Sequence, residues 1–265
     1  MKYGFIGCGN MGGALAIAAA NSIGGNFVYV SDADSEKAKE FADKNSVNVT
    51  TAKAVAEECD FIFLGVKPQV LKSVCSELAP VFKARKDHFV IVSMAAGVDL
   101  VTLENALGTE RIIRIMPNTP VAVGEGMILY CTANAVTDAD ISMFLQLMSS
   151  AGVVDAIDEK LIDAAAAVSG CGPAFVYMFA EALADGAVKC GLPRDKAMKY
   201  AKQTILGSGA MMMSVDKHPG QLKDEVCSPG GTTIEGVLAL ENGGFRYLAS
   251  SAVTAAFEKT AKLKK

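Results

Sequence analysis

The first half of the chain alternates short apolar runs with amphipathic segments that have the spacing of helices. The apolar runs predict strands over residues 3–6, 27–30, 47–49, 61–66, 88–94 and 111–115, and the later runs 127–131 and 153–157 are expected to extend the same sheet. Continuous apolar runs are typical of strands buried on both faces of a parallel sheet. Polar caps are expected for the intervening helices at Asp34 or Ser35, at Asp99, and at Thr137 or Asp138. Repeated strand–helix units predict a doubly wound α/β sheet that binds ligands at the carboxyl ends of its strands.

From about residue 158 the strand signals disappear, and helices are predicted over 164–168, 174–189, 195–213, 233–240 and 245–263. We therefore expect a Rossmann-type dinucleotide-binding domain over 1–157, followed by an all-helical substrate and dimerisation domain over 158–265. The helix over 174–189 is apolar nearly all round, so it must be buried. A domain of roughly a hundred residues can hardly bury several such helices alone. A homo-oligomer is the preferred explanation, and core burial within one subunit is the alternative.

A glycine-rich turn, Gly7-x-Gly9-x-x-Gly12, joins the first predicted strand to the first helix. Gly7 can make the tight turn, Gly9 lets the backbone approach a pyrophosphate, and Gly12 lets helix and strand pack closely. The helix N-terminus offers free N–H groups to the phosphates. Asp32 follows the second strand, 20 residues beyond Gly12, where a ribose-binding carboxylate belongs. This context predicts a dinucleotide site, and a ligand-free turn is the alternative.

Composition excludes several classes of function. The net charge of −4 over 265 residues argues against binding to nucleic acid or anionic membranes. The seven cysteines form no Cys-x-x-Cys pair and there are only two histidines, so no metal site is expected. Reduced thiols in a cytoplasmic protein are the plain interpretation of these cysteines. The uncharged stretch 164–180 is broken at 170–173, which argues against a transmembrane helix, and the N-terminus lacks a signal-peptide layout. Lys262, Lys264 and Lys265 are expected to cap the final helix.

Strong acids, bases and nucleophiles are scarce. His88 begins a strand and His218 precedes a proline in a loop, so both are expected to be structural. The stretch from Ser228 to Thr233 contains Pro-Gly-Gly, which forces a turn, and Thr232 or Thr233 can cap the helix that follows. Such a turn presents N–H groups and hydroxyls to an anion, although a plain helix–helix connection is an equal alternative.

A carboxylate held by amides beside a nicotinamide suggests hydride transfer. Reduction of a ketone creates an alkoxide that needs a proton donor, whereas a protonated imine already carries its proton. A site with amides and hydroxyls but no strong acid therefore favours C=N reduction over C=O reduction.

Several motifs together resemble the pyrroline-5-carboxylate reductase family, essentially from end to end. They are Phe5-Ile6-Gly7-x-Gly9-Asn10-Met11-Gly12, Val66-Lys67-Pro68-Gln69, Arg114-x-Met116-Pro117-Asn118-Thr119-Pro120, Ser169-Gly170-x-Gly172-Pro173-Ala174, and His218-Pro219-Gly220-Gln221-Leu222-Lys223-Asp224 with Ser228-Pro229-Gly230-Gly231-Thr232-Thr233. The resemblance implies that NADPH or NADH reduces the C=N bond of 1-pyrroline-5-carboxylate to L-proline, the last step of proline biosynthesis. It also implies a homodimer through the helical domain, often assembled further into a decamer.

The same resemblance implies roles for individual residues. Those implied to hold the cofactor are Gly7, Gly9, Asn10, Met11, Gly12, Val66, Lys67, Pro68, Ala95, Ala96, Gly97 and Asn118, in addition to Ser31 and Asp32 at the ribose. Those implied to grip the substrate carboxylate, from the partner subunit, are Ser228, Gly230, Gly231, Thr232 and Thr233. Ser228 and Thr233 are also candidate catalytic residues, together with Asp216, which matches an acidic position near the ring nitrogen and would act through water.

The chain departs from the family at the adenosine ribose. Ala52 stands where family members often have Asn, and Asp32 stands where many carry Arg or a Ser-rich sequence. A carboxylate at Asp32 would repel a 2′-phosphate, which favours NADH, although Ser31 and Lys37 could accommodate NADPH.

Two other functions are weighed against the imine reductase. A 3-hydroxyacid dehydrogenase of the same build would want a Lys near residues 165–169, where none stands. A non-catalytic nucleotide-sensing or vitamin-B6-binding module would have no use for the Ser228–Thr233 turn.

Overall fold

The computed structural model describes residues 1–263, which form two compact units. The first unit comprises Met1–Cys171 and the end of the last helix from Phe257, and the second comprises Gly172–Ala256. The expected boundary after residue 157 stays a prediction. Lys264 and Lys265, expected to help cap the final helix, lie outside the described residues.

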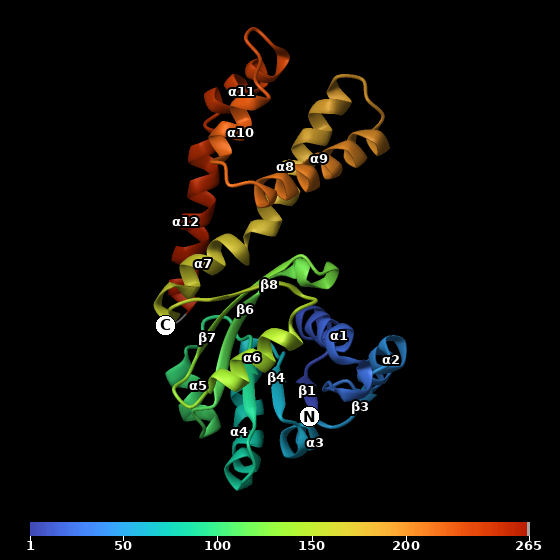
Figure 1. Cartoon of the computed structure of the whole chain (residues 1–265), viewed down its shortest axis with the longest axis vertical. Helices are drawn as coiled ribbons and strands as arrows, with labels where there is room; N and C mark the ends of the chain where they lie inside the picture. The colour runs from blue at the N-terminus through green and yellow to red at the C-terminus, as the bar shows by residue number, and fades with distance from the viewer. Residues whose placement is uncertain (264–265) are drawn as a thin grey trace. The chain divides into compact units, whose positions relative to one another are not determined.

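The first unit is built on an eight-stranded sheet with the order β3-β2-β1-β4-β5-β6-β7-β8 (Figure 1). The strands are β1 (Tyr3–Ile6), β2 (Val28–Ser31), β3 (Asn48–Val49), β4 (Phe61–Leu64), β5 (Val90–Ser93), β6 (Ile112–Pro117), β7 (Gly126–Thr132) and β8 (Gly152–Ala156). The first six are mutually parallel, β7 is antiparallel to β6, and β8 is parallel to β7. The predicted α/β fold is confirmed, including the extension of the sheet by the two later runs.

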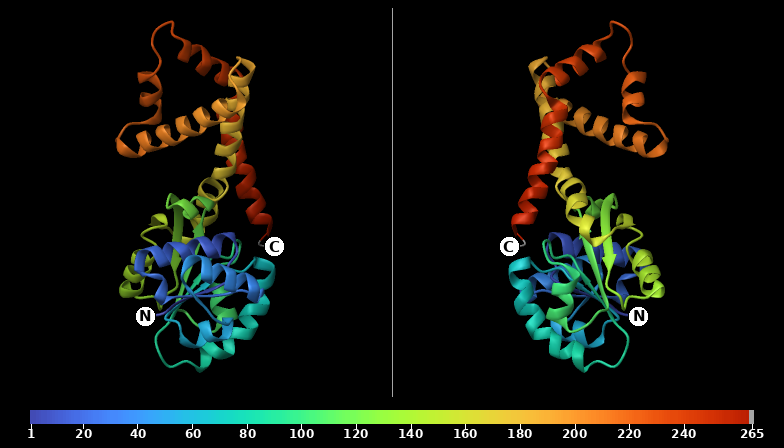
Figure 2. Two further views of the ribbon diagram at one scale, coloured as in Figure 1. Left: turned by 90° about the vertical axis from the view of Figure 1, so that its right-hand side faces the viewer. Right: turned by 90° about the vertical axis from the view of Figure 1, so that its left-hand side faces the viewer.

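Helices cover both faces of this sheet (Figure 2). One face packs against α1 (Asn10–Ile23), α2 (Ser35–Asn45) and α6 (Asp138–Leu147), and the other against α3 (Ala52–Glu58), α4 (Pro68–Ala84) and α5 (Leu100–Leu107). Phe5 and Phe63 stack across β1 and β4 with ring centroids 4.3 Å apart in the first of these cores. Three short 3-10 helices, η1 (Gly25–Phe27), η2 (Thr119–Val123) and η3 (Glu159–Leu161), were not predicted. Burial on both faces accounts for the continuous apolar strands.

Side-chain caps fix several helix starts where the sequence predicts them. Asp34 caps α2, Asp99 caps α5, and Thr137 caps α6 in a capping box with Asp140. In each case the side-chain oxygen accepts an N–H that the first helical turn would otherwise leave unpaired. The local sequence therefore determines where these helices begin.

The second unit is helical, as predicted. Its helices are α8 (Gly172–Lys189), α9 (Arg194–Ser214), α10 (Pro219–Glu225), α11 (Thr232–Asn242) and the larger part of α12 (Phe245–Leu263), of which only α10 was not expected. Within residues 172–256, Figure 2 shows α9, α10 and α11 spread apart rather than packed into a bundle. The buried apolar cluster of this unit is three alanines, at positions 184, 197 and 201. Large apolar side chains such as Met178 and Leu206 are 69% and 63% exposed.

The helix break at Gly170 and Cys171 connects α7 (Ile162–Ser169) with α8. The N–H groups of both residues donate to the carbonyl of Ala166, at 2.8 and 3.2 Å. The N–H groups of Gly170 and Cys171 therefore both have a hydrogen-bond partner at the break, because the Ala166 carbonyl accepts twice. The interruption predicted at 170–173 is confirmed, and it is shorter than expected.

Candidate active site

The three glycines of the first turn have different surroundings. Gly7 adopts φ +105°, which L side chains rarely tolerate, at the end of β1. A Cβ on Gly12 would lie 2.1 Å from the carbonyl oxygen of Gly7, so only hydrogen fits there. A Cβ on Gly9 would meet no described atom within 4 Å. Gly9 therefore leaves space beside the N-terminus of α1, which no described side chain caps.

A fourth glycine, Gly65, follows β4 and packs backbone to backbone against this turn. Its Cβ position lies 2.9 Å from the carbonyl oxygen of Gly7, and its amide donates to the carbonyl of Ile6 at 2.8 Å. The chain order of the sheet reverses at β1, which lies between β2 and β4, so both glycines stand where doubly wound sheets bind ligands. Gly65 was not among the predicted site residues, and the signal that could have indicated it was its place in the buried apolar run 61–66.

Asp32 is held at the end of β2 by three donors. Its Oδ2 accepts the Cys8 N–H at 2.8 Å and pairs with Lys37 Nζ at 3.1 Å, while Oδ1 accepts the Asp34 N–H at 3.2 Å. Burial acts to raise the pKa of Asp32, but the two amides and the Lys37 ammonium together hold this pKa below its ordinary value. The carboxylate is therefore charged, oriented and tied to the glycine turn.

Two hollows adjoin the glycine turn and share Gly9, Gly65, Val66 and Lys67. The first, of about 440 Å³, is lined by Ile6, Gly7, Gly9, Ser31, Asp32, Ala33, Lys37, Ala52, Gly65, Val66, Lys67, Val70, Val74 and Glu77. The second, of about 580 Å³, is lined by Gly9, Asn10, Met11, Gly65, Val66, Lys67, Met94, Met116 and Pro117. We name them the ribose hollow and the nicotinamide hollow after the cofactor parts that the sequence predicts there.

These hollows bring together most of the predicted cofactor residues. Among residues 1–263, Ser31 Oγ is buried without a hydrogen-bond partner, although Ser31 lines the ribose hollow. An orphaned buried hydroxyl and an uncapped helix N-terminus fit a ligand that carries hydroxyls and phosphates. Gly12, Ala95, Ala96, Gly97 and Asn118 are not among the described residues that line either hollow. The cofactor roles of all the predicted residues, Pro68 included, stay predictions. Met94, Met116 and Pro117 were not predicted as lining residues.

Asn118 uses both ends of its side chain inside the protein. Its Nδ2 donates to the carbonyl of Ser169 at 2.9 Å, and its Oδ1 accepts the Met127 N–H at 2.9 Å. The residue is 9% exposed. Its amide therefore connects the sheet with the end of α7.

In the second unit, the Ser228–Thr233 segment forms a turn at the start of α11. The Gly231 N–H donates to the Ser228 carbonyl at 3.0 Å, and Gly230 adopts φ +66°. The expectation that Thr232 or Thr233 caps the helix is wrong, because α11 begins at Thr232 and Gly231 is its N-cap residue, with no side-chain hydrogen bond. A helix N-terminus without a side-chain cap can bind an anion. Ser228, Thr232, Thr233 and Asp216 are exposed within the chain.

The two histidines are structural, as expected. His88 Nε2 lies 2.7 Å from Asp140 Oδ1. His218 Nδ1 accepts the Gly220 N–H at 3.1 Å, and the backbone N–H of His218 donates to Gln221 Oε1. These two bonds form a capping box for α10. No cluster of three or more possible metal ligands occurs in the described part of the chain.

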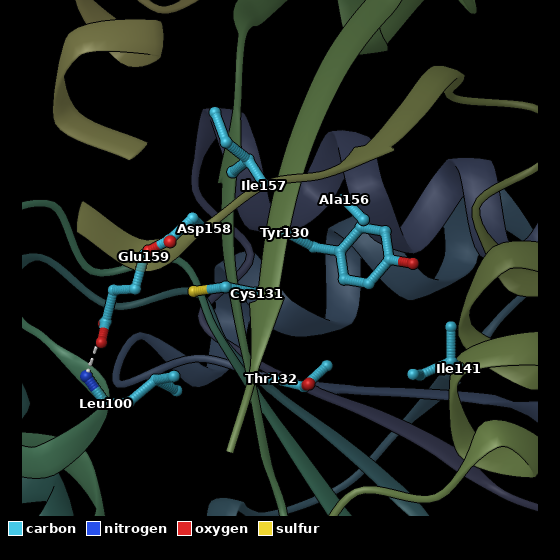
Figure 3. A pocket seen from close by; sticks show the side chains of 9 residues that line it. All are labelled: Leu100, Tyr130, Cys131, Thr132, Ile141, Ala156, Ile157, Asp158 and Glu159. Carbon is cyan, nitrogen blue, oxygen red and sulfur yellow. Dashed lines mark hydrogen bonds between the residues drawn. The ribbon is translucent and has the colours of Figure 1, made fainter. Parts of the chain in front are cut away.

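A third hollow, of about 450 Å³, lies along β7 and β8 and is lined by Leu100, Tyr130, Cys131, Thr132, Ile141, Ala156, Ile157, Asp158 and Glu159 (Figure 3). Its acidic groups already have partners. Asp158 Oδ2 pairs with Lys160 at 2.9 Å, and Glu159 Oε1 accepts the Leu100 N–H at 2.7 Å. Because its acidic groups are occupied, we assign no ligand to this hollow.

Comparison with known proteins identifies the class of enzyme. Residues 2–97 match the family model described as coenzyme F420-dependent NADP oxidoreductase, and residues 159–263 match the model for pyrroline-5-carboxylate reductase dimerisation. The pyrroline-5-carboxylate reductase of Escherichia coli is 43% identical over 100% of this chain and 98% of its own length.

Solved structures agree. A pyrroline-5-carboxylate reductase from Coxiella burnetii superposes with a TM-score of 0.91 at 33% identity, covering 100% of this chain and 98% of its own. The Plasmodium falciparum pyrroline carboxylate reductase with NADP bound gives a TM-score of 0.87 at 35% identity, with the same coverage.

Fold and site thus define an NAD(P)-dependent oxidoreductase with a helical dimerisation domain. The chain belongs to the pyrroline-5-carboxylate reductase family, whose members act on the imine of pyrroline-5-carboxylate. The predicted family, reaction and cofactor class, NADPH or NADH, are confirmed.

By length and composition alone, residues 159–189 are also long and apolar enough to cross a membrane, with a mean hydropathy of 1.4 in an 18-residue window. Only 11% of that window is buried within the chain. The matched dimerisation model covers the same residues, and a subunit interface needs such an exposed apolar surface. The expectation that this helix does not span a membrane stays a prediction.

Proposed function

We propose that this protein binds NAD(P)H along the carboxyl edge of its sheet and reduces 1-pyrroline-5-carboxylate held by the Ser228–Thr233 segment of the partner subunit. The observation that carries the cofactor side is the uncapped N-terminus of α1 beside the empty space at Gly9. The N–H groups of Asn10, Met11 and Gly12 at that terminus would bind the pyrophosphate. Bound there, the cofactor supplies the hydride.

Ser31 and Asp32 would bind the adenosine ribose. The Asp32 carboxylate is oriented by the Cys8 amide. The buried Ser31 hydroxyl has no hydrogen-bond partner among the described residues and could therefore bond to the ribose. Val66, Lys67 and Pro68 would line the other ribose, and residues 95–97 would lie toward the nicotinamide. Asn118 would support this end of the site through its contact with the end of α7. We further propose that NADH is preferred, because the Asp32 charge opposes a 2′-phosphate.

The substrate carboxylate would sit at the N-terminus of α11 in the partner subunit. The amides of Gly230 and Thr232 and the hydroxyls of Ser228 and Thr233 are donors at that terminus, whereas the Gly231 N–H already donates to the Ser228 carbonyl within the turn. These donors suit a carboxylate and leave the ring of the imine free to face the hydride donor. Thr233 and Ser228 would act through orientation, and Asp216 would hold a water near the ring nitrogen.

Dimerisation supplies the partner subunit. Large apolar side chains exposed within residues 172–256 support a dimer through the helical domain, and assembly into a decamer is the further proposal. The net charge of −4 supports the absence of a nucleic-acid or anionic-membrane partner. The seven free cysteines support a cytoplasmic enzyme.

The test is a pair of titrations with NADH and NADPH in the presence of the imine, followed by absorbance. Oxidation of the cofactor with pyrroline-5-carboxylate and not with 3-hydroxyisobutyrate-type partners is expected. No turnover with the imine would exclude the proposal. Nucleotide binding without oxidation under any substrate would indicate the sensing module instead.

The substrate site has its own test. Thr233→Ala removes a hydroxyl at α11 and is expected to raise KM for the imine about tenfold, the loss of one charge-assisted hydrogen bond. The dissociation constant of NADH, measured by fluorescence, should stay the same. An equal loss of cofactor affinity would place the carboxylate site elsewhere.

A further inference from the structure

Strand β6 holds helix α7 at both ends through buried polar side chains. Arg114, in the middle of the strand, pairs with Glu159 in η3, directly before the helix, and with Asp163 in the first turn of the helix. Asn118, directly after the strand, reaches the last residue of the helix. Between these contacts the strand ends in Met116 and Pro117, which line the nicotinamide hollow. The wall of the cofactor site and the helix are therefore attached to the same strand.

The contact at the start of α7 is an ion-pair network around a fully buried guanidinium. Arg114 is 0% exposed, and its two terminal nitrogens lie 2.8 Å from Glu159 Oε1 and 3.4 Å from Asp163 Oδ1. Glu159 Oε1 also accepts the Leu100 N–H at the start of α5 (Figure 3). A buried charge is tolerated only with such partners, so this end of the helix has one defined position.

The contact at the end of α7 is the amide of Asn118. It donates to the Ser169 carbonyl and accepts from the Met127 N–H, both at 2.9 Å. The Ser169 carbonyl belongs to the last helical residue, where no intrahelical N–H is available in an ordinary helix end. Asn118 therefore fixes α7 directly before the break at Gly170 and Cys171, the point where the first compact unit ends.

We infer that Asn118 and the Arg114–Glu159 pair are positioning residues for hydride transfer. They hold α7, the last segment before the helical unit, in a fixed position against β6, whose last residues line the nicotinamide hollow. Asn118 acts through α7 and not by touching the cofactor, since its amide bonds to the Ser169 carbonyl and the Met127 N–H and Asn118 is not among the described residues that line the nicotinamide hollow. This inference rests on the proposed function, because it assumes that the helical unit carries the imine.

The test uses two near-isosteric variants, Asn118→Asp and Glu159→Gln. Asn118→Asp keeps an acceptor for the Met127 N–H but replaces the donor to the Ser169 carbonyl with a second acceptor, so that hydrogen bond is lost. Glu159→Gln removes the negative charge that pairs with Arg114. Each is expected to lower kcat with saturating imine between about 10- and 100-fold, the effect of a small misplacement of the reacting groups. The dissociation constant of NADH should change less than about twofold, because neither contact involves the cofactor hollow.

The double variant separates positioning from two unrelated defects. If both residues act through α7, the loss of kcat in Asn118→Asp/Glu159→Gln should be clearly smaller than the product of the single losses. Asp140→Asn is the matched control, because it weakens the buried capping box of α6 without touching α7, and its kcat should equal that of the parent. Thermal unfolding is measured for all four variants.

Three outcomes would overturn the inference: a loss of NADH affinity equal to the loss of kcat, an unchanged kcat in variants with lowered Tm, or fully multiplicative effects in the double variant. Should Asn118→Asp fail to fold, Glu159→Gln alone still tests the split between kcat and cofactor affinity. Failure of the proposed function is separate, since it would show as absent imine turnover in the parent protein.

Discussion

Cofactor choice is the property of this enzyme that one side chain should control most directly. Asp32 Oδ2 is bonded to the Cys8 N–H at 2.8 Å, and its side chain is 15% exposed. The variant Asp32→Asn keeps the shape and an acceptor for that amide while it removes the negative charge. The variant also loses the acceptor for the Asp34 N–H. Because that bond is lost with either cofactor, the ratio of NADPH to NADH use reports the change in charge.

The magnitude follows from Coulomb's law. Two like unit charges about 4 Å apart repel by about 4 kcal/mol at an effective dielectric constant of about 20. The Lys37 ammonium, 3.1 Å from Asp32 Oδ2, offsets part of this repulsion. We take about 1.4 to 2.8 kcal/mol as the remainder, so Asp32→Asn should raise the ratio of kcat/KM for NADPH to that for NADH by about 10- to 100-fold.

Two controls make this measurement decisive. Lys37→Met removes the compensating cation and should lower NADPH use while leaving NADH use nearly unchanged. Because the pKa of Asp32 is lowered, its carboxylate stays charged from pH 8 down to pH 5.5, while a phosphate monoester loses part of its charge near its second pKa of about 6. Discrimination against NADPH should therefore weaken at pH 5.5 in the parent and not in Asp32→Asn. A ratio unchanged within about twofold in both variants would refute the reasoning.

Two further predictions follow from the glycine turn and the thiols. Gly9→Ala should keep its Tm within about 2 °C and lose about tenfold or more in NADH affinity, because its Cβ meets no described atom within 4 Å and points into space meant for the cofactor. Gly12→Ala should lose both Tm and NADH affinity, because its Cβ would lie 2.1 Å from the Gly7 carbonyl oxygen. Equal losses of Tm in the two variants would contradict the assignment. Burial and the nearby Asp32 charge raise the pKa of Cys8 to about 11, and burial raises that of Cys59 to about 12. Since only the thiolate reacts, on the order of one Cys8 in a thousand is reactive at pH 8. A disulfide reagent at that pH should therefore modify exposed Cys190 and reach Cys8 and Cys59 only on unfolding, as measured by mass spectrometry. Rapid labelling of Cys8 in the folded protein would contradict its burial.

The sequence by itself determined the class of fold and the cofactor turn. Strand runs such as 61–66 are apolar because both sheet faces are covered, and the Asp34, Asp99 and Thr137 caps act over three residues. Gly7, Gly9 and Gly12 also interact over a few residues of chain. Local interactions of this kind leave a readable spacing, which is why they could be predicted.

Only the tertiary structure decided which distant residues meet. Gly65 reaches the Gly7 carbonyl through the β1–β4 pairing, and nothing in its local sequence specifies that neighbour. The Asn118 amide bonds to Met127 and Ser169, which lie 9 and 51 residues away, and no local pattern indicates these partners. Thr232 and Thr233 have the residue type of a cap, yet α11 begins at Thr232, so neither occupies the cap position. Contacts between segments depend on register and helix start, and these are set by packing over the whole sheet.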